Sequence, residues 1–194
     1  MGEEYAPVSA RKARKRLKFI RNRFPHRSEM LTVLGVVVFV CHSWSVLGFL
    51  NRLSAFILYF RVAEIAEIFA FMMAFAFLES LLVAGVLALL SAIMPSKWLR
   101  DGFAYKGFIF MVIATIAAII FQKNLKEVLP PPQVLMLYWV APFVLTAVII
   151  GVVQRMPRAR SILLNLADRF SIMLFVYVPI GLLSLMVVAL RNLL

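Results

Sequence analysis

The chain has 194 residues, of which 63% are hydrophobic and 15% charged. Soluble domains are close to half apolar and a quarter charged, and a folded chain of this size leaves roughly a third of its unfolded surface exposed. The 21 Lys and Arg and the nine Asp and Glu residues cannot cover that surface. The composition therefore excludes a soluble globule and a disordered chain, and it indicates a membrane protein.

Five apolar stretches reach, or nearly reach, the minimum of about 17 residues for a helix that crosses a bilayer. They lie at residues 30–50, 65–94, 107–122, 134–153 and 170–190. Pro95, the proline run at 130–132 and Pro157 interrupt the apolar pattern between them. We predict an all-α fold, a polytopic transmembrane helical bundle of about five spans, within a single domain over residues 30–194.

Basic residues are distributed unevenly between the two sides of these spans. With a cytoplasmic N-terminus, nine Lys and Arg before residue 30, three at 97–106 and four at 155–169 give 16 inside, against five outside. The positive-inside rule then predicts that the N-terminus is cytoplasmic and the C-terminus is outside. We expect the plasma membrane or a bacterial inner membrane to hold the protein.

The second apolar stretch is longer than a bilayer needs. Residues 68–94 alone would form a helix of about 40 Å at 1.5 Å per residue, so this span must tilt or project beyond the outer face. Residues 53–62 are apolar but too few to cross, and we expect them to form an outer interfacial or re-entrant segment.

Residues 1–29 are predicted to form a basic, amphipathic cytoplasmic tail. Leu17, Ile20 and Phe24 share one helical face among nine Lys and Arg residues. Such a helix would lie on the inner leaflet and bind anionic lipid headgroups. The cations that we assign to this contact are Arg11, Lys12, Arg14, Lys15, Arg16 and Lys18. A purely topogenic signal and a docking site for an acidic partner are the alternatives. We expect no nucleic-acid binding, because no base-reading motif accompanies the charge.

Glu79 is the most informative residue of the sequence, because an acidic side chain within a span is costly and by default suggests function. At 1.5 Å per residue, His42 in the first span and Tyr138 in the fourth lie at a similar depth. A buried network of Glu79, His42 and Tyr138 is therefore allowed. It would act as a proton relay or a substrate-binding point, unless Glu79 is a neutral acid that only fixes helix register.

Two further patterns mark the second span. Arg61, Glu64 and Glu67 lie at its outer end, where we expect ion pairs, with cation binding as the alternative. Small residues also recur along it at four-residue spacing, which lets helices approach closely and predicts a central position for this helix. These packing residues are Ser80, Ala84, Ala88 and Ala92.

Motifs for catalysis or cofactor binding are missing from the sequence. We find no Gly-rich phosphate loop, zinc-binding His pair or nucleophile elbow, and we predict no enzymatic activity, no metal site and no cofactor. Cys41, the single cysteine, cannot form an internal disulfide. An axial bond from His42 to haem or chlorophyll is a minor alternative.

The function that the sequence favours is that of a non-enzymatic structural or accessory subunit, or a scaffold, of a membrane assembly. Such a protein would bind a protein partner or form a homo-oligomer, and the small-residue ridge is the feature that supports this. The alternative is a proton-coupled transporter or channel that uses Glu79. A lipid-modifying or lipid-transferring enzyme, which would rest only on the cytoplasmic arginines, comes third.

Overall fold

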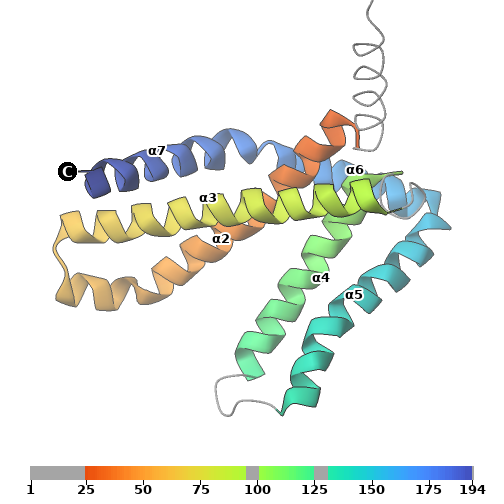
Figure 1. Cartoon of the computed structure of the whole chain (residues 1–194), viewed down its shortest axis with the longest axis horizontal. Coiled ribbons are helices and arrows are strands. Elements are labelled where there is room, and N and C mark those ends of the chain that lie inside the picture. The colour runs from red at the N-terminus through yellow and green to blue at the C-terminus, as the bar shows by residue number, and fades with distance from the viewer. Residues whose placement is uncertain (1–24, 95–100, 125–130, 194) are drawn as a thin grey trace, which may run out of the picture.

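The structure, a computed structural model, describes residues 25–94, 101–124 and 131–193 (Figure 1). These residues form helices and short connections, with no strand among them. The helices are α2 (Arg27–Tyr59), α3 (Val62–Ile93), α4 (Phe103–Asn124), α5 (Pro132–Gln154), α6 (Pro157–Ser171) and α7 (Leu174–Leu193). All except α6 are long and apolar enough to cross a membrane. The predicted all-α bundle of five spans is confirmed, and the chain is an integral, multi-pass membrane protein.

One predicted segment differs from the structure. Residues 53–59, expected to form a separate interfacial or re-entrant segment, continue α2, which is 33 residues long. Neither Pro nor Gly occurs between Leu50 and Tyr59, so nothing in the sequence interrupts the helix there. The helix ends at Phe60, whose backbone N–H donates to the carbonyl of Phe56 at 2.9 Å. An apolar stretch too short to cross a membrane has thus lengthened the span before it.

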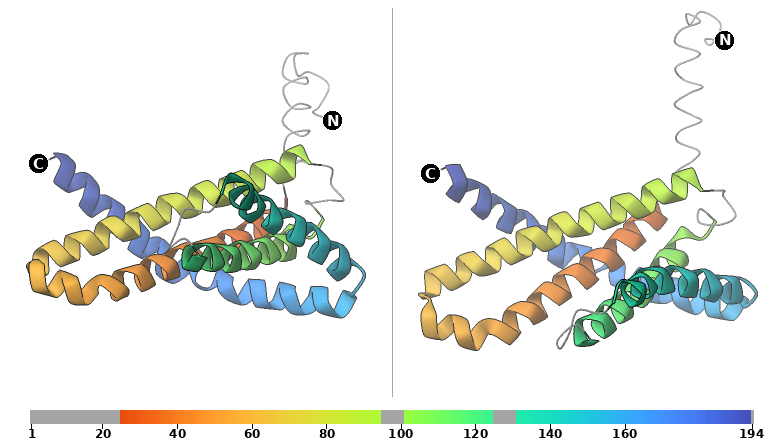
Figure 2. Two further views of the ribbon diagram at one scale, coloured as in Figure 1. Left: turned by 90° about the horizontal axis from the view of Figure 1, so that it is seen from below. Right: turned by 60° about the horizontal axis from the view of Figure 1, so that its bottom comes forward.

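The helices form two groups that diverge from a shared end (Figures 1 and 2). α3 packs on α2 and α7, whereas α4 packs on α5 and reaches the first group through α2. α2 is the most widely connected helix, with contacts to α3, α4, α6 and α7. The sequence predicted a central α3, but α2 holds that position. The beginning of α2 and the C-terminus lie at opposite ends of the molecule, as an odd number of crossings requires.

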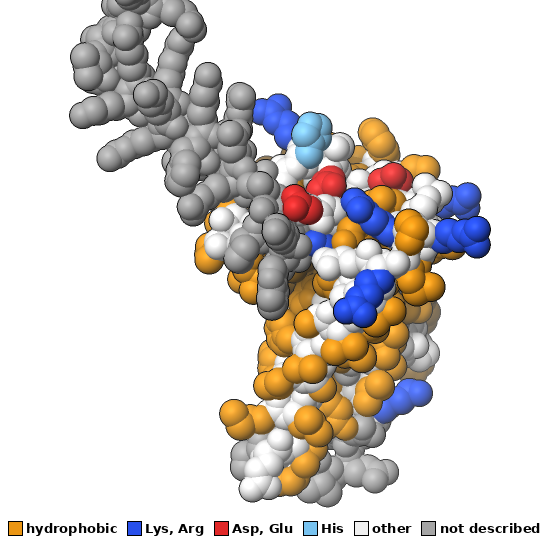
Figure 3. All heavy atoms as spheres, turned by 90° about the vertical axis from the view of Figure 1, so that its right-hand side faces the viewer, with side chains coloured by type: hydrophobic (Ala, Val, Ile, Leu, Met, Phe, Trp, Pro, Cys, Tyr) orange, Lys and Arg blue, Asp and Glu red, His pale blue; other side chains and the backbone are white. Residues whose placement is uncertain are grey.

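Polar contacts join the helices at the shared end. Glu29 of α2 accepts a hydrogen bond from the backbone N–H of Phe103, the first residue of α4, at 3.2 Å. The hydroxyl of Thr32 donates to Asp168 of α6 at 3.1 Å. These two contacts tie α2 to α4 and α6. Charged side chains gather on this end of the molecule, as Figure 3 shows. Residues 1–24 of the predicted basic tail, including the six cations assigned to lipid contact, lie outside the described residues, whereas residues 27–29 form the start of α2.

Glycines allow the closest helix crossings. A Cβ built on Gly35 of α2 would lie 2.7 Å from the Cα of Ser171, at the end of α6. A Cβ on Gly107 of α4 would lie 2.8 Å from the side chain of Val33. Both distances are shorter than any real Cβ contact, so these crossings require glycine. In lipid, where apolar surface gives no net driving force between helices, such close packing is a main source of association.

We expect the change Gly35→Ala to destabilise the protein, because the new methyl group meets the backbone of α6. Overpacking of this kind costs about 1–3 kcal/mol. The matched control is Gly151→Ala in α5, where a Cβ would meet no atom within 4 Å. Unfolding of the purified protein by denaturing detergent measures both. Equal stability of the two variants would contradict the crossing at Gly35.

Candidate functional site

A cavity of about 460 Å³ lies between α2, α3, α4 and α5. Its size falls in the range of small-molecule sites, about 300–1,000 Å³. Apolar side chains form most of its wall, and Glu79 is the only charged residue among the described residues that line it. The lining residues are Val40, Cys41 and Trp44 of α2; Glu79, Leu82, Val83, Val86, Leu87 and Leu90 of α3; Phe110, Met111, Ala114, Thr115 and Ala118 of α4; and Phe143 of α5.

Glu79 lies close to the middle of α3. It is 17 residues from Val62 and 14 residues from Ile93, or about 26 Å and 21 Å along the helix. Glu67 lies 12 residues, or about 18 Å, before it on the same helix, and pairs with Arg191 at the outer end. Both ends of α3 are therefore far enough from Glu79 to place its carboxyl group within the hydrocarbon of a bilayer about 30 Å thick.

No described residue gives the Glu79 carboxyl group a hydrogen bond or an ion pair, although its side chain lines the cavity. Thr115 also lines the cavity, but its hydroxyl already donates to the carbonyl of Met111 at 2.7 Å. Glu79 is also exposed at the surface of the bundle. The predicted buried carboxyl group is thus a surface group that faces both a cavity and the surrounding lipid.

The cavity opens to the outside of the bundle between α3 and α5. Leu82 of α3 and Phe143 of α5 both line it, and they are 66% and 57% exposed. In a bilayer, side chains exposed near the middle of α3 would contact lipid tails. A molecule dissolved in the bilayer could therefore enter the cavity sideways.

A second cavity, of about 310 Å³, adjoins the first between α4 and α5. Both cavities are lined by Phe110, Ala114, Ala118 and Phe143, so the two form one apolar groove along α4. Tyr138 lines the second cavity, where its ring lies 5.4 Å from that of Phe121.

His42 occupies a third environment. Its ring is fully buried and lies 5.0 Å from the ring of Tyr177 in α7. Nδ1 lies 2.9 Å from the carbonyl oxygen of Val38, whereas Nε2 has no partner among the described residues. The structure thus does not assemble the predicted trio, because Glu79, His42 and Tyr138 lie against different neighbours.

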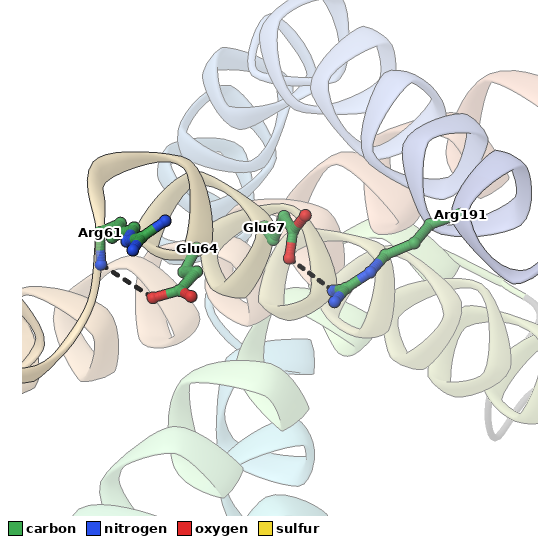
Figure 4. A network of polar contacts seen from close by, with 4 residues as sticks. All are labelled: Arg61, Glu64, Glu67 and Arg191. Atoms are coloured by element: carbon green, nitrogen blue, oxygen red, sulfur yellow. Dashed lines mark hydrogen bonds and ion pairs between the residues drawn. The ribbon is translucent and has the colours of Figure 1, made fainter.

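The N-terminal end of α3 carries the polar contacts shown in Figure 4. The carboxylate of Glu64 accepts a hydrogen bond from the backbone N–H of Arg61 at 2.8 Å. It thus provides an acceptor for one of the backbone N–H groups that have no partner within the helix at the start of α3. Glu67 forms an ion pair of 2.6 Å with Arg191, near the end of α7. The guanidinium of Arg191 also lies 5.9 Å from the ring centre of Phe71. The sequence located Arg61, Glu64 and Glu67 at one end of this span but missed Arg191, which no sequence spacing connects to them.

The small residues of α3 lie inside the chain. Ser80 is 0% and Ala88 7% exposed, while Ala84 packs against a core cluster that includes Val36 and Leu87. Ala92 is half-buried. The hydroxyl of Ser80 donates to the carbonyl of Phe77 in its own helix. The ridge is thus occupied by contacts within the chain.

Sequence reasoning missed Cys41, Trp44 and the α4 residues of the cavity. Helical spacing could have found the α3 residues, because Leu82, Val83 and Val86 follow Glu79 at intervals of three, four and seven. No sequence signal indicates which helices form the rest of the cavity wall.

No family model, curated protein or solved structure matches this chain. Among the described residues, no group of three or more His, Cys, Asp or Glu could hold a metal ion.

We expect the Glu67–Arg191 pair to contribute little to stability. Both side chains are partly exposed, at 38% and 55%, and exposed pairs are worth about 0.2–1 kcal/mol. A double-mutant cycle of Glu67→Gln and Arg191→Gln, read by detergent unfolding, should give a coupling in this range that falls at high salt. A coupling above about 2 kcal/mol, or one that is insensitive to salt, would mean that the pair is shielded from water.

Proposed function

We propose that this protein is a small, non-enzymatic carrier that takes a hydrophobic solute from the bilayer and couples its movement to protons on Glu79. The observation that carries the proposal is that the carboxyl group of Glu79, which has no hydrogen bond or ion pair with any described residue, lines a cavity of about 460 Å³ that is exposed at the surface of the bundle. In this proposal the carboxyl group keeps its proton while the site is empty, because a carboxylate without a counter-charge is strongly disfavoured in hydrocarbon. Binding or release of a solute would then be linked to loss or gain of a proton.

The geometry supports this function over the scaffold that the sequence favoured. The scaffold rested on the small-residue ridge of α3, and its central members Ser80 and Ala88 are buried within the chain. They are not available to a partner. Glu79, in contrast, lines a cavity, and a residue that only fixes the packing of two helices does not need a cavity beside it.

A role as an accessory subunit or scaffold is the second candidate. It is favoured by the exposure of α5 and α7, of which only 11% of the most apolar window is buried. Trp139 and Phe143 of α5 and Phe175 of α7 are more than half exposed. A protein partner or a second copy could cover these faces, although lipid covers such faces in any membrane protein.

We expect the N-terminus to face the cytoplasm and the C-terminus to lie outside. The charge bias of 16 to five and the five spans support this orientation. Reporter domains fused to each terminus should be active in opposite compartments. If both fusions report from the same compartment, a count of five crossings is wrong and the assigned depth of Glu79 has no basis.

The carrier proposal predicts that Glu79→Gln abolishes proton-linked flux and leaves the fold intact. Vesicles with an acidic interior, a trapped pH indicator and a clamped membrane potential would receive tetraphenylphosphonium, tetraphenylborate or triphenylphosphine oxide. At least one probe should raise the internal pH at least fivefold faster with the wild-type protein than with Glu79→Gln.

The matched control is Glu64→Gln, which removes a carboxylate at the outer end of the same helix and should behave like the wild type. If none of the three probes distinguishes the wild type from Glu79→Gln, and the variant is folded, the carrier proposal is wrong.

A further inference from the structure

The walls of the Glu79 cavity contain one acidic group and no basic group among the described residues. A ligand with a positive charge would form an ion pair with the carboxylate. An anion would be repelled by it, with no basic group on the wall to compensate. A neutral solute would use only the apolar wall. The charge of the lining thus selects among the three classes of hydrophobic solute.

Trp44 adds a second feature that suits a cation. It lies on the cavity wall contributed by α2, one helical turn after Cys41, and is 40% exposed. The face of an indole ring attracts a cation, and this attraction is stronger where water is excluded. Glu79 comes from α3, which packs on α2, so a cation inside the cavity would have both a carboxylate and an aromatic side chain in the wall around it.

The rest of the wall is suited to a bulky apolar body. Leu, Val, Phe, Met and Ala side chains make up most of the lining, and the adjoining cavity of about 310 Å³ extends the apolar groove along α4. The opening between Leu82 and Phe143 faces lipid. Solutes that reach the site from this side must first dissolve in the bilayer, which excludes small hydrated ions such as Na⁺.

Resting on the carrier function proposed above, we propose that the ligand is a lipophilic cation: a hydrophobic body with one amine, quaternary ammonium or phosphonium centre. Its charged centre binds between Glu79 and Trp44, and its body fills the groove. The empty site holds the carboxylic acid, and binding of a permanent cation releases that proton to water, so that a neutral ion pair occupies the cavity. One proton leaves for each cation bound.

Cys41 provides the readout, because it is the only cysteine of the chain and lines the same cavity. The full-length protein in lipid nanodiscs would be alkylated with N-ethylmaleimide, a neutral, membrane-permeant reagent. Tetraphenylphosphonium should slow the reaction of Cys41 at least fivefold. Tetraphenylborate has nearly the same shape and the opposite charge, and triphenylphosphine oxide is neutral. Each of these two should slow the reaction less than twofold.

Variants test whether the protection of Cys41 from alkylation depends on Glu79 and Trp44. Glu79→Gln should lose the protection by tetraphenylphosphonium, whereas Glu64→Gln should keep it. Trp44→Leu should weaken the apparent affinity several-fold without removing the charge preference. Because Trp44→Leu leaves Glu79 in place, it tests the site even if Glu79→Gln does not fold. In a weakly buffered solution, binding to the wild type should also release one proton per cation.

The outcomes separate this inference from the carrier function. Equal protection by all three probes, retained in Glu79→Gln, would overturn the cation preference while the cavity remained a binding site for hydrophobic solutes. Protection by none, together with positive flux in the vesicle experiment, would overturn only the assignment of the ligand to this cavity. Protection by none and no flux would overturn both proposals. Cys41 that reacts only after dissociation of an oligomer would overturn the inference and indicate that another chain covers the cavity.

Discussion

Hydrocarbon offers no hydrogen bonds, so each polar group within the bilayer must find its partner inside the protein. The hydroxyls of Ser80, Ser91, Thr115 and Thr146 do this within their own helices, where each donates to a backbone carbonyl three or four residues earlier. Contacts between charged or strongly polar groups of different helices lie toward the ends, as at Glu29, Thr32 and Glu67. Two groups depart from this rule: Nε2 of His42 is buried without a partner among the described residues, and Glu79, near the middle of α3, has no hydrogen bond or ion pair with any of them.

The same solvent explains the shape of the bundle. Apolar side chains gain little by leaving lipid for protein, so helices associate where their surfaces fit closely. α4 approaches α2 at Gly107, close to the end that the polar contacts hold together. One and two turns later, α4 carries Phe110, Met111 and Ala114, which line the cavity. Beyond this crossing α4 and α5 diverge from α2 and α3, and the cavity lies between the two groups.

Much of the fold follows from the sequence, because span length and hydrophobicity are local properties that lipid enforces directly. Five spans could be predicted, as could the acidic residue near the middle of α3 and the charged residues at the N-terminal end of that helix. The pairing of helices could not, since the side of a helix that faces a neighbour depends on how all the helices fit. Small residues on α3 suggested a central α3, yet α2 is central, with Gly35 at one of its crossings. The trio of Glu79, His42 and Tyr138 was predicted only from their similar depth along three helices. Depth does not determine the direction in which a side chain points around the helix axis, and these three side chains lie against different neighbours.

The direction in which Glu79 points also helps to explain why this position carries a carboxyl group. A residue that fixes the register of two helices needs a partner on the second helix, as Thr32 has in Asp168. Glu79 has none among the described residues, and it faces a cavity and the lipid. Glutamine or serine would be a less costly way to place a polar group there, because neither can become charged in hydrocarbon. What a carboxyl group adds is the exchange of a proton for another cation, and that exchange has a use only when the second cation comes from outside the chain.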